Sequence, residues 1–339
     1  MAYVTFDASR LLDAIPLGRA AIDFNPVDVP NPLQDCHTFK KYLGGSPANI
    51  AVGLARLGKK VGFIGKVSPD QFGQFIRDYF TRDGIDISHI SDAPKGCSLG
   101  LTFTELRETL ETSLLMYRTL AADLQLDVAD VDAAYIASAR LLLISGTSLA
   151  ESPSREAALK AVELAGKVGT PVVFDIDYRP YNWKNPDEIA LYYALVARRS
   201  QMVLGSREEY DLMERLMVDT PSSDAESAQR WIGFGNRIVI IKHGKEGSTA
   251  FAADGERFRI KPFPVKAAKA TGGGDGYASA LLYGLLEGWD IMDALEFGSA
   301  SASMLVAAHS CADAMPSVEA VRAFIAAEKA EYGETIARG

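Results

Sequence analysis

Cysteine and histidine are scarce in this sequence. Its 339 residues include three cysteines, Cys36, Cys97 and Cys311, and four histidines. An odd number of scattered cysteines does not build a disulfide framework and fits a reducing compartment, so we expect a cytoplasmic protein. The histidines show none of the spacings that are typical of zinc ligands.

Long apolar runs and an excess of positive charge are also missing. No apolar run reaches the ~18 residues of a membrane span. The first residues lack the basic segment and apolar stretch of a signal peptide. A formal net charge of -9 argues against binding nucleic acid through its phosphates. We therefore expect neither a membrane nor a nucleic acid as partner.

What the chain does have is an alternation of short apolar runs with helix-like segments. With 48% hydrophobic residues, it can bury a full core. Helices are expected over 153–168 and 186–200. This rhythm predicts an α/β fold with a mostly parallel sheet covered on both faces. The expected strands cover residues 14–17, 61–64, 141–145, 172–175, 202–205, 238–242 and 248–252.

Two segments break that rhythm. Residues 24–42 carry several prolines and no helical period, and residues 98–117 are typical of two strands joined around 107–109. Neither segment therefore belongs to the alternating pattern.

The most informative stretch is Ala270-Thr271-Gly272-Gly273-Gly274-Asp275-Gly276-Tyr277, which opens a helix-like run over 277–286. Glycine allows positive φ and close approach of a ligand. The free N–H groups of a helix's first turn form an anion site. Asp275 among them is placed as a base beside a phosphate cradle, although an acid after glycine can also be a simple N-cap.

A second motif lies far upstream, Gly44-Gly45-Ser46-Pro47-Ala48-Asn49. Ser46 suits a helix N-cap and Pro47 the first helical position. The helix continues over 50–57 and ends at Gly58. The glycine pair and Asn49 also suit a site that hydrogen-bonds hydroxyl groups.

These two motifs resemble the signatures of the ribokinase-like (PfkB) sugar kinases. Residues 44–73 resemble the N-terminal signature, and Gly272 to Asp275 resemble the C-terminal Gly-Ala-Gly-Asp, with Gly273 in place of Ala. The resemblance covers nearly the whole chain. It implies one kinase domain over 1–339, a three-layer αβα ribokinase-like sandwich. Segments 24–42 and 98–117 would form a small β-lid that excludes water. Family lids often pair subunits, which implies a homodimer through the lid.

The resemblance also implies ATP and Mg²⁺ as co-substrate and cofactor. Asp275 would accept the proton of the acceptor hydroxyl, and the N–H groups of Gly272, Gly273 and Gly274 would hold the migrating phosphoryl group.

Four shorter stretches resemble one branch of the family, which acts on a sugar acid of myo-inositol breakdown. The implied reaction converts 5-dehydro-2-deoxy-D-gluconate to its 6-phosphate. Two other acceptors stay open, 2-keto-3-deoxygluconate and fructose. A non-catalytic sugar sensor on the same fold stays open as well. The four stretches are residues 18–23, 174–180, 242–247 and 309–316.

On the substrate side, Asp23, Gly44, Gly45 and Asn49 are expected to contact sugar hydroxyls. A carboxylate on the sugar would suit the planar fork of an arginine. Arg118, Arg19 and Lys66 are the open alternatives for holding it, and each of them could instead be an ordinary surface charge.

On the nucleotide side, the resemblance implies a larger group of residues. Glu208 would organise water around Mg²⁺, although Gly205 stands where relatives carry Asn. Asp177 also stands in place of an Asn and is expected to pair with Arg179. Lys269 stands where many relatives carry Asp near a K⁺ ion, so its ammonium is expected to replace that cation. The nucleotide-binding residues implied are Lys242, Gly244, Gly247, Ser206, Ser303, Ala307 and His309.

Overall fold

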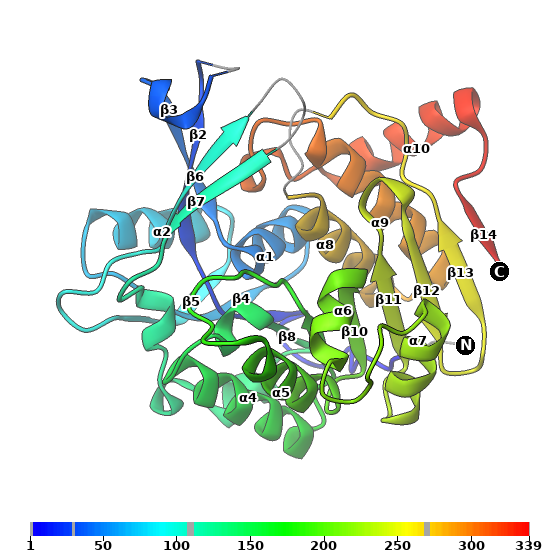
Figure 1. Cartoon of the computed structure of the whole chain (residues 1–339), viewed down its shortest axis with the longest axis horizontal. Coiled ribbons are helices and arrows are strands. Elements are labelled where there is room, and N and C mark those ends of the chain that lie inside the picture. The colour runs from blue at the N-terminus through cyan, green and yellow to red at the C-terminus, as the bar shows by residue number, and fades with distance from the viewer. Residues whose placement is uncertain (1–2, 29–30, 107–111, 268–271, 339) are drawn as a thin grey trace.

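A ten-stranded sheet runs through the middle of the protein (Figure 1). The computed structural model describes all residues except 1–2, 29–30, 107–111, 268–271 and 339. The strand order is β14-β13-β12-β11-β10-β9-β8-β1-β4-β5. From β11 to β5 every neighbouring pair is parallel, and β12, β13 and β14 add antiparallel pairs at one edge. The predicted mostly parallel sheet is confirmed.

Six of the seven parallel strands fall where the apolar runs placed them, whereas the strand over residues 86–92 was not among those expected. Those six are buried along most of their length, as is typical of a sheet covered on both faces. The strand over residues 86–92 lies at the edge of the sheet and has one buried residue. The parallel strands are β1 (Ile15–Leu17), β4 (Gly62–Val67), β5 (Asp86–Asp92), β8 (Leu142–Ser145), β9 (Val172–Asp175), β10 (Met202–Ser206) and β11 (Ile238–Lys242). The antiparallel ones are β12 (Ser248–Ala252), β13 (Arg257–Ile260) and β14 (Ile336–Arg338).

Helices cover both faces of this sheet, and each face has its own cluster of buried apolar side chains. The three-layer αβα arrangement that the family resemblance implied is therefore confirmed. One layer consists of α1 (Ser46–Arg56), α2 (Gln71–Arg82), α8 (Gly273–Leu286), α9 (Ile291–Val306) and α10 (Val318–Tyr332). The other consists of α3 (Ala133–Ala137), α4 (Ser154–Val168), α5 (Pro186–Ala197), α6 (Arg207–Glu214) and α7 (Asp224–Gly233).

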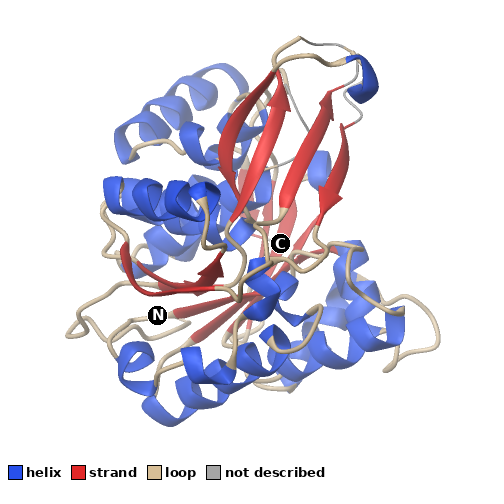
Figure 2. Cartoon of the chain, turned by 90° about the vertical axis from the view of Figure 1, so that its left-hand side faces the viewer, coloured by secondary structure: helices blue, strands red, loops and turns tan. Residues whose placement is uncertain are grey.

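A second, four-stranded sheet stands out from the main body (Figure 2). We call it the lid. Its order is β3-β2-β6-β7, and the central pair β2–β6 is parallel. Phe24 and Phe103 stack across that pair with ring centroids 5.0 Å apart. Its strands are β2 (Ala21–Pro26), β3 (Phe39–Gly44), β6 (Leu101–Leu106) and β7 (Thr112–Tyr117).

The start of α1 differs from the sequence prediction. Ser46 is the first helical residue, and Gly45 is the N-cap. Gly45 has a φ of +97°, and a Cβ there would lie 2.4 Å from the carbonyl oxygen of Arg19, so only glycine fits. The prediction of Ser46 as N-cap was wrong, and its hydroxyl is left available for another partner. Asp23 lies within the lid strand β2.

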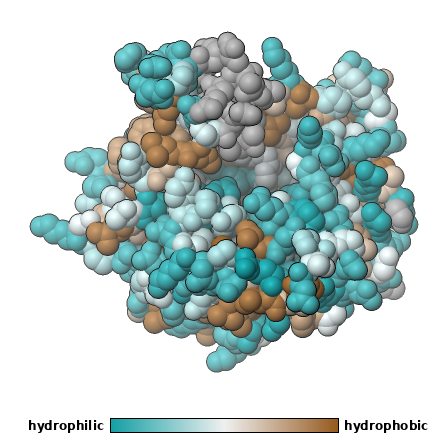
Figure 3. Space-filling model, in the orientation of Figure 1, coloured by the Kyte–Doolittle hydropathy of each residue, from teal (hydrophilic) through white to brown (hydrophobic). Residues whose placement is uncertain are grey.

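The molecular surface is mostly hydrophilic in the view of Figure 3. Apolar side chains gather over the lid at the upper left and over the helices at the bottom. On β7, Leu115 and Tyr117 are exposed. Among the residues that the structure describes, no helix combines the length and apolar character needed to cross a bilayer.

Candidate active site

The carboxyl ends of the parallel strands bring several polar side chains to one edge of the sheet. Asp175 is the last residue of β9, Ser206 of β10 and Lys242 of β11. Asp175 pairs in register with Ser145 of β8, and Ser206 pairs with Lys242. In open α/β sheets this edge is where ligands bind.

Asp275 lies at this edge, in the first turn of α8. Gly272 caps the helix with a φ of +89°, which requires glycine. The Ser46 hydroxyl donates to Asp275 Oδ1 over 2.7 Å, and the Asn49 amide donates to Oδ2 over 2.7 Å. The Cys311 thiol lies 3.5 Å from the same Oδ2 atom. The structure thus brings the two glycine motifs of the sequence into direct contact.

The same Ser46 hydroxyl reaches a second carboxyl group, Asp175, whose Oδ2 atom lies 3.3 Å away. Lys242 Nζ lies 3.6 Å from the other oxygen of Asp175. Burial raises the pKa of Asp175 to about 7, against the attraction of Lys242. Burial and the nearby Asp177 also raise the pKa of Asp275, whereas the bonds from Asn49 and Ser46 lower it.

Asp177 is held in a conformation that few residues adopt. Its φ is +39°, a region in which Asn and Asp are enriched. Arg179 Nη2 lies 2.8 Å from Asp177 Oδ1, and the Ser145 hydroxyl donates to Oδ2 over 3.1 Å. The charge of Asp177 raises the pKa of Arg179. The acid that stands in place of Asn therefore forms an ion pair with Arg179, as the sequence suggested.

Next to Asp275 opens a cavity of about 1020 Å³. Lys242 Nζ lies 3.6 Å from the point that a Cβ on Gly274 would occupy, so this ammonium faces the first turn of α8. The first N–H groups of a helix have no intrahelical partner. An anion placed here would meet these N–H groups and the charge of Lys242. Apolar walls made by Phe263, Val265 and Val306 suit a flat, apolar ring system.

The cavity collects only part of the predicted nucleotide group. Lys242, Gly244, Gly247 and Ser303 line it. The other three predicted residues do not line this cavity. Ser206 and Ala307 lie at helix ends, and His309 contacts the lid. Ser206 caps α6, where its hydroxyl accepts from the N–H of Glu209 over 3.2 Å. Ala307 is the exposed C-cap of α9.

His309 is in contact with the lid instead of the cavity. Its Nδ1 lies 2.9 Å from the Tyr42 hydroxyl, and its Nε2 lies 2.8 Å from the carbonyl oxygen of Pro26. The Asn25 side chain donates to the His309 carbonyl over 2.6 Å. His309 therefore ties the lid to the segment that follows α9.

On the substrate side, Gly44 lies directly against Asp23. A Cβ on Gly44 would come within 2.2 Å of Asp23 Oδ1, so glycine is required for this carboxylate to lie there. Gly45 follows as the N-cap of α1, and Asn49 is buried in the first turn of that helix. These residues connect the lid strand β3 to Asp275.

The three candidates for holding a carboxylate are in different situations. Lys66 forms an ion pair with Asp130 over 2.8 Å. Arg118 is paired with Asp123, but its Nε and Nη1 atoms have no hydrogen-bond partner among the described residues. Arg19 is only 4% exposed, and its Nε and Nη1 atoms also lack a partner in the described part of the chain. Burial, and then repulsion by Arg118, lowers the pKa of Arg19.

Buried, unpaired guanidinium nitrogens are costly. Two buried guanidinium groups that repel each other are costlier still, because each positive charge destabilises the other. An anion between Arg19 and Arg118 would supply the missing acceptors. The structure therefore favours these arginines over Lys66 as an anion site between lid and core.

The two predictions that concern metal ions are Glu208 near Mg²⁺ and Lys269 in place of K⁺. Glu208 is exposed on α6, whereas both carboxylate oxygens of its neighbour Glu209 accept backbone N–H groups, from Tyr178 and Ser206. Within the described residues no group of three or more acidic, His or Cys side chains could hold a metal. Lys269, the predicted substitute for a monovalent cation, lies outside the described residues.

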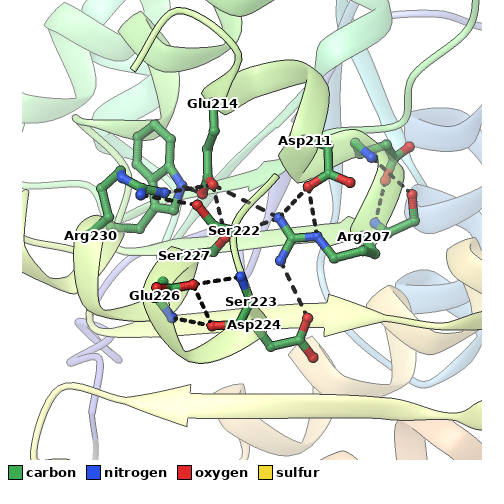
Figure 4. Close-up of polar contacts among 12 residues, drawn as sticks. Arg207, Asp211, Glu214, Ser222, Ser223, Asp224, Glu226, Ser227 and Arg230 are labelled. Carbon is green, nitrogen blue, oxygen red and sulfur yellow. Dashed lines mark hydrogen bonds and ion pairs between the residues drawn. The ribbon is translucent and has the colours of Figure 1, made fainter. Parts of the chain in front are cut away.

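A charged cluster joins α6 to α7 (Figure 4). The buried Glu214 accepts bonds from Arg230 Nη1 over 2.6 Å, Trp231 Nε1 over 2.7 Å and the Ser227 hydroxyl over 2.8 Å. Asp224 pairs with Arg207 at 3.3 Å and with His243 Nε2 at 2.7 Å. The cluster fastens α6 to α7, and through His243 it reaches the loop that begins at Gly244.

The sequence alone missed two polar contacts at this edge. Ser46 was assigned to the helix cap, and nothing in a Gly-Gly-Ser-Pro motif indicates that its hydroxyl spans two distant acids. Glu209 carried a readable signal, because Ser206 and Glu209 have the Ser-x-x-Glu spacing of a capping box.

Comparison with known proteins places this geometry in a wider group. Residues 13–318 match the pfkB family carbohydrate kinase profile. A 5-dehydro-2-deoxygluconokinase of Clostridium botulinum is 63% identical over 339 residues, covering 100% of both chains. One of Clostridium perfringens is 63% identical over 338 residues, again covering 100% of both. The crystal structure of a PfkB protein from Polaromonas sp. JS666 has a TM-score of 0.77 at 29% identity, covering 90% of this chain and 99% of that one.

Proposed function

Because the chain belongs to the pfkB family of carbohydrate kinases, we propose that it phosphorylates 5-dehydro-2-deoxy-D-gluconate with ATP, giving the 6-phosphate. The family predicted from the sequence is confirmed. The acceptor follows from the printed activity of relatives that are 63% identical over their full length. The observation that carries the chemistry is Asp275, held by Ser46 and Asn49 beside the cavity that Lys242 lines.

Asp275 is the proton acceptor in this proposal. As the acceptor oxygen bonds to the γ-phosphorus, its proton passes to an Asp275 carboxylate oxygen. The bond between the γ-phosphorus and the β–γ bridging oxygen breaks, and ADP leaves. General-base contributions of this kind are about 10²- to 10⁴-fold.

The phosphoryl group would travel past the N-terminus of α8. Lys242 faces Gly274 there. Gly272 is the N-cap and Gly273 and Gly274 begin the helix, so their N–H groups would hold the phosphoryl group. The nucleotide would occupy the cavity that Gly244, Gly247 and Ser303 line. Mg²⁺ would neutralise phosphate charge and keep most of its water, with Glu208 in contact only through water.

The sugar would lie between the lid and Asp275. Asp23, Gly44, Gly45 and Asn49 line the path from the lid to the base. Arg19 and Arg118 would hold the carboxylate, because their buried nitrogens lack acceptors within the described chain. Lys66 is a weaker candidate, since its ammonium is already paired with Asp130. A lid over this site would exclude water, which competes as acceptor.

The lid also suggests an assembly. Its edge strand β7 exposes Leu115 and Tyr117, at 43% and 58% of their surface. Two copies of the chain could cover these side chains by pairing lids, which gives a homodimer. Sedimentation velocity tests this: the wild type should be a dimer and Leu115→Asp should shift it toward monomer, whereas a monomeric wild type would contradict it.

The experiment that tests the function is turnover by Asp275→Asn. The variant should lose at least 10²-fold in kcat while still binding ATP and sugar acid, because the amide keeps the size but cannot take the proton. Binding is measured by calorimetry. A wild type that binds the sugar but transfers no phosphoryl group would favour the sensor alternative. Preference for 2-keto-3-deoxygluconate or fructose would keep the mechanism and change the acceptor.

A further inference from the structure

One hydroxyl group touches two carboxyl groups at the centre of the site. Ser46 Oγ lies 2.7 Å from Asp275 Oδ1 and 3.3 Å from Asp175 Oδ2. A serine hydroxyl has a single proton and so can donate only one hydrogen bond. If both contacts are hydrogen bonds, the second requires a proton on one of the carboxyl groups, with the serine oxygen accepting.

The surroundings decide which acid carries that proton. Asp275 accepts from both Ser46 and Asn49, and donors stabilise the charged form of a carboxyl. Asp175 is 3% exposed, and its Oδ1 atom has no hydrogen-bond partner among the described residues. Burial of a carboxyl oxygen that accepts no hydrogen bond favours the neutral acid.

The charged groups around Asp175 also favour its neutral form on balance. Lys242 of β11 attracts its negative form, and three acids repel it: Asp177 after β9, Glu209 of α6 and Asp275 of α8. Arg179 also attracts the negative form of Asp175, but this guanidinium is paired with Asp177. Two cations, of which Lys242 lies at 3.6 Å, thus oppose three carboxylates and burial. The consequence is a pKa of Asp175 raised to about 7.

We propose that Asp175 and Ser46 are positioning residues for Asp275, joined in a one-way hydrogen-bond chain. The neutral acid of Asp175 donates to Ser46 Oγ, and the Ser46 hydroxyl donates to Asp275. The direction of this chain keeps Asp275 ionised and leaves its remaining lone pairs for the proton of the acceptor hydroxyl. The inference rests on the proposed function, since it concerns the base of that reaction.

The decisive variant is Asp175→Asn. An amide has the shape of the neutral acid and supplies an N–H to Ser46, so it imitates the proposed state permanently. The variant should keep kcat within about threefold of wild type, which is less than 1 kcal/mol of barrier. In the wild type kcat should fall as Asp175 ionises on the alkaline side, and this limb should be missing in the variant.

Ser46→Ala tests the other half of the chain. Removing a hydrogen bond to a charged group should lower kcat about ten- to a hundredfold. It should move the acidic limb of the kcat profile to higher pH, because Asp275 loses a donor. Ser46→Thr keeps the hydroxyl and should restore much of both. Ser279→Ala is the matched control, because that buried hydroxyl donates to a backbone carbonyl of α8 and should leave the pH profile unchanged.

These experiments distinguish a failure of this inference from a failure of the proposed kinase function. A hundredfold loss in Asp175→Asn, with active wild type and intact folding by circular dichroism, would overturn the inference alone, because an ionised Asp175 would then be required. An unchanged pH profile in Ser46→Ala would do the same. In the double variant, Asp175→Asn should add little to Ser46→Ala, since the two residues act through one chain. Wild type without turnover on any acceptor would overturn the function and the inference together.

Discussion

Asn49 donates a hydrogen bond of 2.7 Å to Asp275 across a sequence separation of 226 residues. One residue comes from the first turn of α1 and the other from the first turn of α8. Because the two helices pack side by side on the same face of the sheet, the two glycine motifs are parts of one packed unit. In the proposed reaction, substrate orientation and proton transfer would therefore depend on the same contact.

This contact predicts the response of Asn49→Ala to pH. Burial and Asp177 raise the pKa of Asp275, while Asn49 and Ser46 lower it. Activity needs the charged form, so it is lost as the pH falls through the pKa of Asp275. Without Asn49 that pKa rises further, and the acidic limb of kcat/KM should move to higher pH. Profiles between pH 4 and pH 9 test this; a limb that stays in place would contradict the role of Asn49.

Asp175 predicts how the free energy of unfolding depends on pH. Its pKa is raised from 3.8 to about 7, so between these values the folded chain holds a proton that the unfolded chain has lost. Stability from this group is complete below the lower value and is lost as the pH rises through the upper one. Asp175→Asn should flatten this slope and be more stable than wild type above pH 7. Urea denaturation at several pH values measures it, and equal slopes would contradict it.

Arg19 predicts selectivity for a sugar acid. Arg19→Gln should raise KM for the sugar acid roughly ten- to a hundredfold, because charge-assisted bonds to the carboxylate are lost. Any residual turnover of fructose, which has no carboxylate, should change far less. Lys66→Gln is the matched control, since that ammonium is paired with Asp130. Equal effects of the two variants on KM would contradict the assignment of Arg19.

We expect substitution of Glu214 to destabilise the folded chain, although this residue is not part of the proposed active site. Glu214→Ala leaves Arg230, Trp231 and Ser227 without their buried acceptor. Breaking one side of a buried charged pair costs about 3–5 kcal/mol. Glu226→Ala, which removes an exposed acid of the same α7 region, should cost far less, ~1 kcal/mol. Thermal denaturation compares them, and similar losses would show that the cluster of Figure 4 is not a stabilising centre.

The sequence predicted the fold well, for physical reasons. The apolar runs of β8, β9, β10 and β11 are short, buried and flanked by helices, so local pattern and tertiary structure agree. Three glycines followed by an acid also predicted the helix start at which Asp275 lies, and its role as base stays a prediction.

Contacts between distant side chains could not be predicted in the same way. The second contact of Ser46 depends on how α1 packs over the end of β9, which no local pattern encodes. The family resemblance implied His309 in the nucleotide pocket, yet its ring lies within hydrogen-bond distance of Tyr42 and Pro26 of the lid segment. Glu209 is different, because the Ser-x-x-Glu spacing from Ser206 indicates its capping contact, whereas its second contact, with the N–H of Tyr178, has no local signal.

In the proposed reaction Asp275 is the base for phosphoryl transfer from ATP to a sugar acid. The most direct test is ADP release with ATP, Mg²⁺ and a panel of acceptors: 5-dehydro-2-deoxygluconate, 2-keto-3-deoxygluconate, fructose and ribose. We expect clear preference for the first, measured as kcat/KM, and loss of that turnover in Asp275→Asn. Release of ADP that is unchanged in Asp275→Asn, or no release with any acceptor, would contradict the account.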